Sequence, residues 1–258
     1  MTEINTKIVQ SFVAYLATGG RSRKTVENVL LTLSSILRKA RAWDYACGSF
    51  SLADITLPRE NVKKEQRCFS DEEIGKILAA APEPFGTIFA VASVLGLRIG
   101  EVLALRVRDV DFTTKIVRVR QQSIDSATRQ IQAVKSNASS ADVPLPSQLE
   151  ARLRKHLQTH DGKTDLLFIN SRGRPYSANK LRAKVLHRLL VQLGIPRGGF
   201  HSTRHGVTSA LLADGATPAV VQKQLRHSDP RITLGVYAHV IGNQQRDAVE
   251  NRSARKNH

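Results

Sequence analysis

The sequence is short of cysteine, of acidic residues and of long hydrophobic runs, and each shortage excludes a class of protein. The two cysteines, Cys47 and Cys68, form no CxxC pair and no Cys/His cluster, so neither a disulfide framework nor a structural zinc site is expected. The longest apolar run, residues 88–97, is far too short to cross a bilayer. The amino terminus is polar and mixed in charge, unlike a secretory signal. A soluble, cytosolic protein is therefore expected.

The shortage of acidic residues leaves the chain strongly basic. Its 258 residues include 39 lysines and arginines against 22 aspartates and glutamates, which gives a net charge of +17 and an isoelectric point near 10.5. Such an excess favours a polyanionic partner, and binding should weaken steeply with salt as counterions are released. Nucleic acid is the partner that this charge favours, although an unrelated basic protein, such as a ribosomal one, has a similar balance.

Hydropathy periodicity predicts a mainly helical (α+β) protein with one small antiparallel sheet. Apolar residues recur at three- and four-residue spacing from Val26 onward, behind a capping Ser22. Ser70 with Glu73 three residues later forms a capping box at a second helix. After Asp111 the apolar period becomes alternating, as in strands. The prediction places helices at 11–18, 26–37, 70–81, 85–95, from 98, and at 147–160, 177–193, 201–213, 217–226 and 230–239, with strands at 116–120, 129–135 and 141–146.

A charged stretch divides the chain into two parts of unequal size. Pro58 and the run ENVKKEQR break any regular element between residues 54 and 68. We therefore expect a short helical amino-terminal domain over 1–60, a linker over 61–68 and a larger domain over 69–258. Basic residues flank the predicted amino-terminal helix and either bind DNA or form a solvated helix face. They are Arg21, Arg23, Lys24, Arg38, Lys39 and Arg41.

The stretch from 201 to 240 collects the residue types that phosphoryl transfer at a nucleic-acid backbone requires. In HSTRH, His201 and Arg204 face the same way on a helix, with His205 close by. Histidine suits proton movement near neutral pH, and His227 follows in LRHSDP. Tyr237 on the next helix could attack phosphorus and store the bond as a phosphotyrosyl ester, without a metal or nucleotide cofactor. The alternatives are an exposed Arg204 and a Tyr237 ring that only packs in the core. A zinc site is disfavoured because no glutamate lies between the first two histidines.

Two upstream residues are candidates for the same site. Arg98 ends an apolar run, and two guanidiniums together suit a phosphorane-like transition state. Its alternative role is a buried pair with Glu101, one turn along the helix. Lys135 ends a predicted strand before the polar turn SNASS and could protonate a leaving oxygen, although a solvent-exposed lysine is the commoner explanation for that position.

These residues make the chain resemble the tyrosine recombinases of the phage-integrase family. The matching segments are GLRIGEVLALRVRDVD around Arg98, Lys135 in its hairpin, HSTRH at 201–205, LRHSDP at 225–230 and the tyrosine of VYAHV. The resemblance spans about residues 67–240. It implies a helical catalytic domain behind a short core-binding (SAM-like) DNA-binding domain.

The resemblance also implies a role for each site residue. Tyr237 would be the nucleophile that leaves a 3′-phosphotyrosyl link and a free 5′-hydroxyl. Arg98 and Arg204 would hold the scissile phosphate, and Lys135 would be the general acid for the 5′ oxygen. The remaining site residues would be His201 and His227, which assist proton transfer and bind the phosphate, and Glu101, which supports the site from behind.

The implied activity is site-specific DNA recombination by two rounds of transesterification. The implied assembly is a homo-tetramer on two double-stranded DNA duplexes, with the polar tail (242–258) docked on a neighbouring subunit. No cofactor, metal or membrane is implied, and the location would be cytoplasmic, in a bacterial or phage-derived, nucleoid-associated protein. A type IB topoisomerase, which relaxes DNA without exchanging partners, is the nearest alternative.

Two features depart from the family pattern. Arg226 stands where the family usually has a glycine before the second histidine, so the turn that presents His227 is expected to be strained or differently shaped. The helical segment before residue 60 is also shorter than usual, which points to an abbreviated or truncated domain. A truncated, non-recombining DNA-binding relic is therefore a further alternative. A metal-dependent nuclease is disfavoured because no cluster of carboxylates is visible in the sequence.

Overall fold

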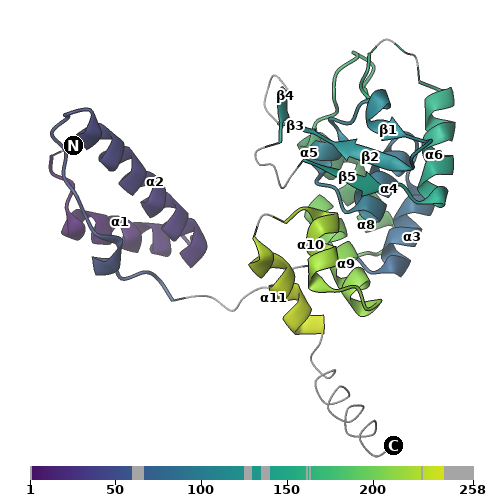
Figure 1. Cartoon of the computed structure of the whole chain (residues 1–258). Coiled ribbons are helices and arrows are strands. Elements are labelled where there is room, and N and C mark those ends of the chain that lie inside the picture. The colour runs from purple at the N-terminus through teal and green to yellow at the C-terminus, as the bar shows by residue number, and fades with distance from the viewer. Residues whose placement is uncertain are drawn as a thin grey trace, which may run out of the picture. The chain divides into compact units, whose positions relative to one another are not determined.

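The structure is a computed structural model that describes residues 2–59, 67–124, 130–134, 140–160, 162, 164–227 and 229–240, with only the backbone of residues 232 and 238–240. It divides into two compact units, Met1–Glu65 and Gln66–His258 (Figure 1). Within the described residues, no helix is both long and apolar enough to span a bilayer.

The first unit is a pair of helices with a small core of its own. Helix α1 (Thr6–Thr18) begins at Asn5, whose side chain caps Ile8, and therefore starts earlier than predicted. Helix α2 (Arg23–Ala42) is capped by Ser22, as the sequence predicts. A single 3₁₀ turn (Leu52–Asp54) follows. Its main buried apolar cluster consists of Val9, Val13, Val26, Leu30 and Ile55.

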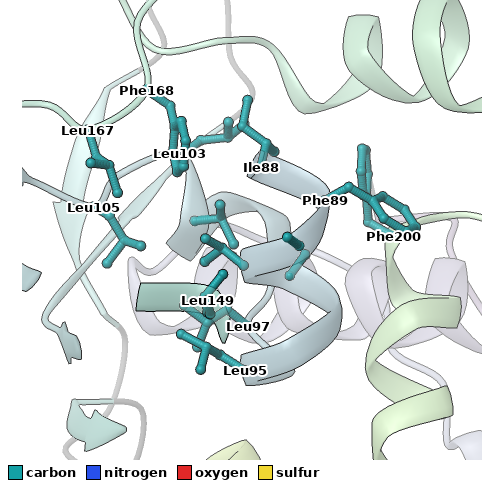
Figure 2. Close-up of a cluster of buried hydrophobic side chains, with 14 of the residues drawn as sticks. Ile88, Phe89, Leu95, Leu97, Leu103, Leu105, Leu149, Leu167, Phe168 and Phe200 are labelled. Atoms are coloured by element: carbon teal, nitrogen blue, oxygen red, sulfur yellow. The ribbon is translucent and has the colours of Figure 1, made fainter. Parts of the chain in front are cut away.

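The second unit is built around α4 (Phe85–Leu95), almost all of which is buried. The predicted Ser70–Glu73 capping box is present at α3 (Asp71–Ala80), which packs on α4. Figure 2 shows Ile88, Phe89 and Leu95 surrounded by side chains from the rest of the unit, Phe168 and Phe200 among them. After α4 come the short α5 (Ile99–Val102) and a 3₁₀ turn (Val107–Asp109).

The strands form two small antiparallel sheets, and the prediction of one sheet is wrong. A three-stranded sheet has the order β1 (Val110–Asp111), β2 (Ile116–Val119), β5 (Ala141–Pro144). The second sheet pairs β3 (Gln121–Ser123) with β4 (Ile131–Ala133). The strand predicted at 116–120 ends at Val119, and the chain then changes partner from β5 to β4.

Helices complete the second unit, and the mainly α fold class is confirmed. They are α6 (Ser147–Gln158), α7 (Ala178–Leu181), a π turn (Arg182–Leu186), α8 (His187–Gln192), α9 (Phe200–Ala213), α10 (Pro218–Leu225) and α11 (Pro230–Val240). The helix predicted at 177–193 is thus interrupted by the π turn. Helices α9, α10 and α11 pack on one another (Figure 1), and α9 also packs on α4.

Candidate active site

The site begins where α4 ends and α5 starts. Gly96 closes α4 in the left-handed conformation, with φ of 65°. A Cβ atom at this position would lie 2.2 Å from Leu225 Cδ2, so a larger residue would force the Leu225 side chain at the end of α10 to move. Arg98 follows as the residue that precedes α5. The ends of α4, α5 and α10 are therefore held together at one point.

Glu101 lies buried behind Arg98. The carboxylate accepts hydrogen bonds from the Arg98 main-chain nitrogen at 2.8 Å and from its Nη1 at 2.9 Å. The Arg98 side chain stays 35% exposed, whereas that of Glu101 is 2% exposed. The predicted pair is thus present, and it does not bury the arginine. One edge of the Arg98 guanidinium is fixed by Glu101, and the side chain remains accessible to an anion.

Arg204 of α9 is a buried cation that ties three helices together. Its Nη1 donates to the carbonyl of Gly96 at 2.6 Å, and its Nη2 donates to the carbonyl of Leu225. The alternative of an exposed Arg204 is wrong, because the residue is 5% exposed. Burial, followed by the like charge of Arg98, lowers the pKa of Arg204 to about 9. The guanidinium is still charged at neutral pH, and an anion beside it would offset its desolvation.

Two histidines accompany Arg204 on α9. His201 is exposed and His205 is half-buried. Partial desolvation, together with the nearby positive charges of Arg204 and Arg98, lowers the pKa of His201. Burial, then His201 and Arg204, lowers the pKa of His205 in the same direction. Both rings are therefore mostly neutral at pH 7 and can accept a proton.

His227 sits in the turn between α10 and α11. Thr217 and Pro218 start α10, and the chain leaves that helix after Leu225. The His227 ring is buried, with Nδ1 hydrogen-bonded to Thr233 Oγ1 at 2.8 Å. Burial and the charge of Arg204 lower its pKa to about 4, so the ring is neutral at pH 7.

Arg226 adopts the backbone conformation that a glycine would supply. Its φ is 56° and its ψ is 46°, in the left-handed region. The turn is thus strained, at a cost of about 1–2 kcal/mol, rather than differently shaped. Its buried Nη2 lies 2.5 Å from Glu101 Oε2. Removing one partner of a buried ion pair typically costs about 3–5 kcal/mol, because the other charge is left uncompensated.

Tyr237 lies on α11, which packs against both α9 and α10. Its ring is half-buried beside the cluster of Leu212, Val221 and Leu225. The core-packing alternative therefore describes part of its surroundings. Helix α11 nevertheless contacts α9, which carries Arg204, and α10, which ends two residues before His227.

Lys135 lies outside the described residues. The last pairing before it joins the Val134 nitrogen to the Arg120 carbonyl at 3.2 Å. The β3–β4 hairpin packs on α5, and a Cβ atom at Gly100 would lie 2.8 Å from the Ser123 carbonyl oxygen. Strand β3, which pairs with the strand that precedes Lys135, therefore packs against α5, the helix that follows Arg98.

The predicted DNA-binding residues lie in the first unit. Arg21, Arg38 and Arg41 are exposed. Arg23 and Lys24 both form ion pairs with Glu27, so their charges are partly compensated, and Lys39 lies over the ring of Trp43 at 5.7 Å. A role in DNA binding stays a prediction for all six residues.

Two site features were not anticipated from the sequence. Arg226 stands out in the sequence as a departure, but its partner Glu101 is 125 residues away and no local signal points to it. Thr233 as the partner of His227 was not predicted either, although its six-residue spacing places it at the start of the next helix. Among the described residues, no group of three His, Cys, Asp or Glu side chains could hold a metal ion.

Comparison with known proteins shows that the chain is similar to phage integrases and tyrosine recombinases. The model of the phage integrase family matches residues 67–244. A XerC-like tyrosine recombinase of Caldanaerobacter subterraneus subsp. tengcongensis is 29% identical over 270 residues, covering 94% of this chain and 69% of that protein. A putative prophage phiRv2 integrase of Mycobacterium tuberculosis is 27% identical over 181 residues, and the match covers 68% of this chain but only 48% of that protein.

Solved structures share the fold at low sequence identity. The Tn1549 transposon integrase, in complex with a circular intermediate DNA, superposes with a TM-score of 0.78 at 18% identity. That match covers 97% of this chain and 86% of the other. XerH recombinase in a post-cleavage complex with palindromic difH DNA gives a TM-score of 0.66 at 20% identity, over 96% of this chain and 72% of XerH.

Proposed function

Because the chain belongs to the phage integrase family, we propose that it is a site-specific DNA recombinase that breaks and rejoins strands through a 3′-phosphotyrosyl intermediate. The observation that carries the proposal is the junction of α4, α5, α9 and α10. There Arg204 is hydrogen-bonded to the ends of two other helices, beside a partly exposed Arg98 and a neutral His227. Such a junction supplies cations for a phosphate and a neutral base for the proton of an attacking hydroxyl in one place.

The first step is the binding of the scissile phosphate. Arg98 and Arg204 donate hydrogen bonds to its non-bridging oxygens, and Glu101 keeps the Arg98 guanidinium in one orientation. The pKa of Arg204, lowered by burial, rises again when the phosphate supplies the missing negative charge. Both guanidiniums interact more strongly as negative charge grows on the phosphorus centre, which is the condition for catalysis.

The second step transfers the strand to the enzyme. The Tyr237 oxygen attacks phosphorus and its proton passes to a neutral histidine, His201 or His227. The bond from phosphorus to the 5′ oxygen breaks, and that oxygen takes a proton from Lys135. A 5′-hydroxyl from the partner strand then attacks the phosphotyrosine and releases the tyrosine. One ester bond forms for each that breaks, so no cofactor is consumed.

The assembly and location belong to the same proposal. Strand exchange between two duplexes needs a cleaving subunit at each of four strands, which a homo-tetramer supplies, with the tail (242–258) docked on a neighbouring subunit. The partner is double-stranded DNA that carries a recombination site, in the cytoplasm. If tail deletion leaves tetramer assembly on DNA unchanged, the docking idea fails.

The decisive experiment traps the covalent intermediate. A DNA duplex nicked near the cleavage point, drawn from sequence flanking the gene or from a pool, is incubated with protein in EDTA. We expect a covalent protein–DNA band with wild type and none with Tyr237→Phe, because the phenyl ring lacks the attacking oxygen. DNA affinity of the variant should stay within about twofold, since its charge is unchanged.

Three results would redirect the assignment. A band that persists in Tyr237→Phe would move the nucleophile to another residue. If wild-type covalent complexes relax supercoiled plasmid but never join two duplexes, the activity is that of a type IB topoisomerase. Salt-sensitive DNA binding without any covalent band would favour a DNA-binding relic.

A further inference from the structure

The side chain of Arg226 enters the candidate site from the turn after α10. It is 1% exposed and reaches Glu101, whose Oε2 lies 2.5 Å from Nη2. Its Nη1 donates to the Gln224 carbonyl at 3.4 Å. The buried Nε has no hydrogen-bond partner among the described residues. One of its donors is thus unsatisfied in a site that otherwise satisfies its polar groups, and such a group calls for an explanation.

Glu101 links Arg226 to Arg98. Its Oε2 accepts from Arg226 Nη2, while its Oε1 accepts from Arg98 Nη1 at 2.9 Å. A carboxylate with partners on both oxygens cannot rotate without breaking a buried, charge-assisted hydrogen bond. The Arg98 main-chain nitrogen also donates to Oε2, at 2.8 Å, so Arg226 adds a second donor at this oxygen and strengthens the hold of the carboxylate on Arg98.

The charges in this cluster favour a doubly negative centre. Among the described residues of the cluster, Arg98, Arg204 and Arg226 bring three positive charges against the single negative charge of Glu101, which leaves an excess of two positive charges. A phosphodiester carries one negative charge, and attack by a tyrosinate oxygen produces a phosphorane-like state with two. A glycine at 226 would leave an excess of only one. The arginine therefore shifts the cluster toward the transition state rather than the bound substrate.

We propose that Arg226 is a positioning residue of the phosphate site, which helps to orient Arg98 through Glu101 and adds a third positive charge to the cluster. The inference rests on the proposed function for its reaction. The bland alternative is a buried ion pair that only stabilises the turn. The two differ in what they predict for the chemical step once the protein is folded.

A double-variant cycle separates these roles. Arg226→Gly, Arg226→Lys, Glu101→Gln and the double variant Arg226→Gly/Glu101→Gln are compared with Arg154→Gln, an exposed arginine of α6 whose change removes the same charge. The measurements are the single-turnover cleavage rate of the nicked duplex at saturating protein, DNA affinity, and the thermal unfolding midpoint. Only variants that are folded at the assay temperature enter the comparison of rates.

We expect Arg226→Gly to slow cleavage roughly ten- to a hundredfold, with DNA affinity within about threefold. Arg226→Lys should recover part of the rate, since it keeps the charge but not the forked donor. The double variant should be no slower than Arg226→Gly, because both changes break one chain of contacts. A wild-type rate in folded Arg226→Gly, or rate losses that multiply in the double variant, would overturn the proposal. If Arg226→Gly does not fold, the Lys variant and Glu101→Gln decide.

A phosphate probe keeps this inference distinct from the proposed function. Inorganic phosphate at about 100 mM, against chloride of equal ionic strength, should raise the unfolding midpoint of wild type more than that of Arg226→Lys or Arg226→Gly. Arg154→Gln should match wild type and corrects for general stabilisation by phosphate. A phosphate effect that depends on Arg226 without any covalent band would keep the inference and sink the strand-cleavage proposal. Equal shifts in all variants would overturn the inference.

Discussion

At the scale of single residues, burial rather than sequence position sets the chemistry of the histidines. His227 is 7% exposed, hydrogen-bonded to Thr233 and surrounded by positive charge from Arg204 and Arg98. Each of these factors except the hydrogen bond disfavours the imidazolium, which is why the pKa falls to about 4. The ring can serve as a base or a hydrogen-bonding group at neutral pH, but it does not carry a stored proton.

The lowered pKa of His227 predicts a stability that depends on pH. The folded pKa of about 4 lies below the unfolded value of about 6.5, so the unfolded chain binds the extra proton. The contribution of this group is therefore complete above pH 6.5 and is lost as the pH falls toward 4. Between pH 7 and pH 5 the free energy of unfolding should drop by about 2 kcal/mol from this histidine alone.

The measurement is the free energy of unfolding in urea at pH 7 and at pH 5, for wild type and for His227→Gln. The slope of this free energy against pH is compared between the two proteins. His201 and His205 shift in the same direction and remain in both proteins, so the difference between the two slopes isolates His227. Equal slopes in the two proteins would contradict the assignment.

At the scale of elements, the contact between α5 and the β3–β4 hairpin depends on a missing side chain. A Cβ atom at Gly100 would lie 2.8 Å from the main-chain oxygen of Ser123, closer than atoms pack. We expect Gly100→Ala to push the hairpin away and to destabilise the fold by about 1–3 kcal/mol. The same displacement should slow strand cleavage, because the hairpin leads toward Lys135.

Gly75→Ala in α3 is the matched control for that prediction. Gly75 is exposed in its helix, and no atom lies within contact of the position that an added methyl group would take, so its change should stabilise by up to about 1 kcal/mol. Opposite signs for the two glycines in urea unfolding support the packing argument. Equal effects would show that the hairpin moves freely on α5.

The helices and strands also show which structural features local sequence patterns can predict. The caps at Ser22 and Ser70 are predictable because the capping side chain and the backbone nitrogen that it accepts from lie within four residues of sequence. The split into two sheets is not, since the alternation of IVRVR gives the faces of a strand but not its partner. The π turn at 182–186 escapes prediction for a similar reason, as helical periodicity continues through it.

In the candidate site too, local sequence predicts the residue types but not their distant partners. The residue types in HSTRH and LRHSDP predict that the histidines and Arg204 belong to the site, and the structure brings Arg204, Arg98 and Glu101 to one junction. The partners of Arg204 are main-chain carbonyls, 108 and 21 residues away in the chain. Every residue has such a carbonyl, so no sequence pattern could have selected these two.

At the scale of the whole molecule, the two units have separate hydrophobic cores and unequal charge. Residues 1–65 hold ten lysines and arginines against six acidic residues, so 66–258 carry +13 of the net +17. Among the described residues, each unit has a buried apolar cluster made of its own side chains. The fragment 66–258 should therefore fold alone and keep most of the salt dependence of DNA binding.

Binding titrations from 50 to 200 mM salt test the charge argument. The full chain should lose about a thousandfold or more in affinity over this range if it neutralises six or more phosphates. The fragment should bind more weakly at every salt concentration but keep more than half of the slope. A slope that falls by more than half would identify the first unit as the main contact with the phosphates.

Loss of Arg204 should impair both the activity and the stability of this protein. The side chain that would hold the phosphate also closes the junction between the ends of α4 and α10. A random substitution at Arg204 leaves two buried carbonyls without donors, so it should lower the amount of folded protein in the cell as well as the activity. If selection for recombination were relaxed, a gene losing this arginine would drift toward a degraded product rather than a folded, inert DNA-binding protein.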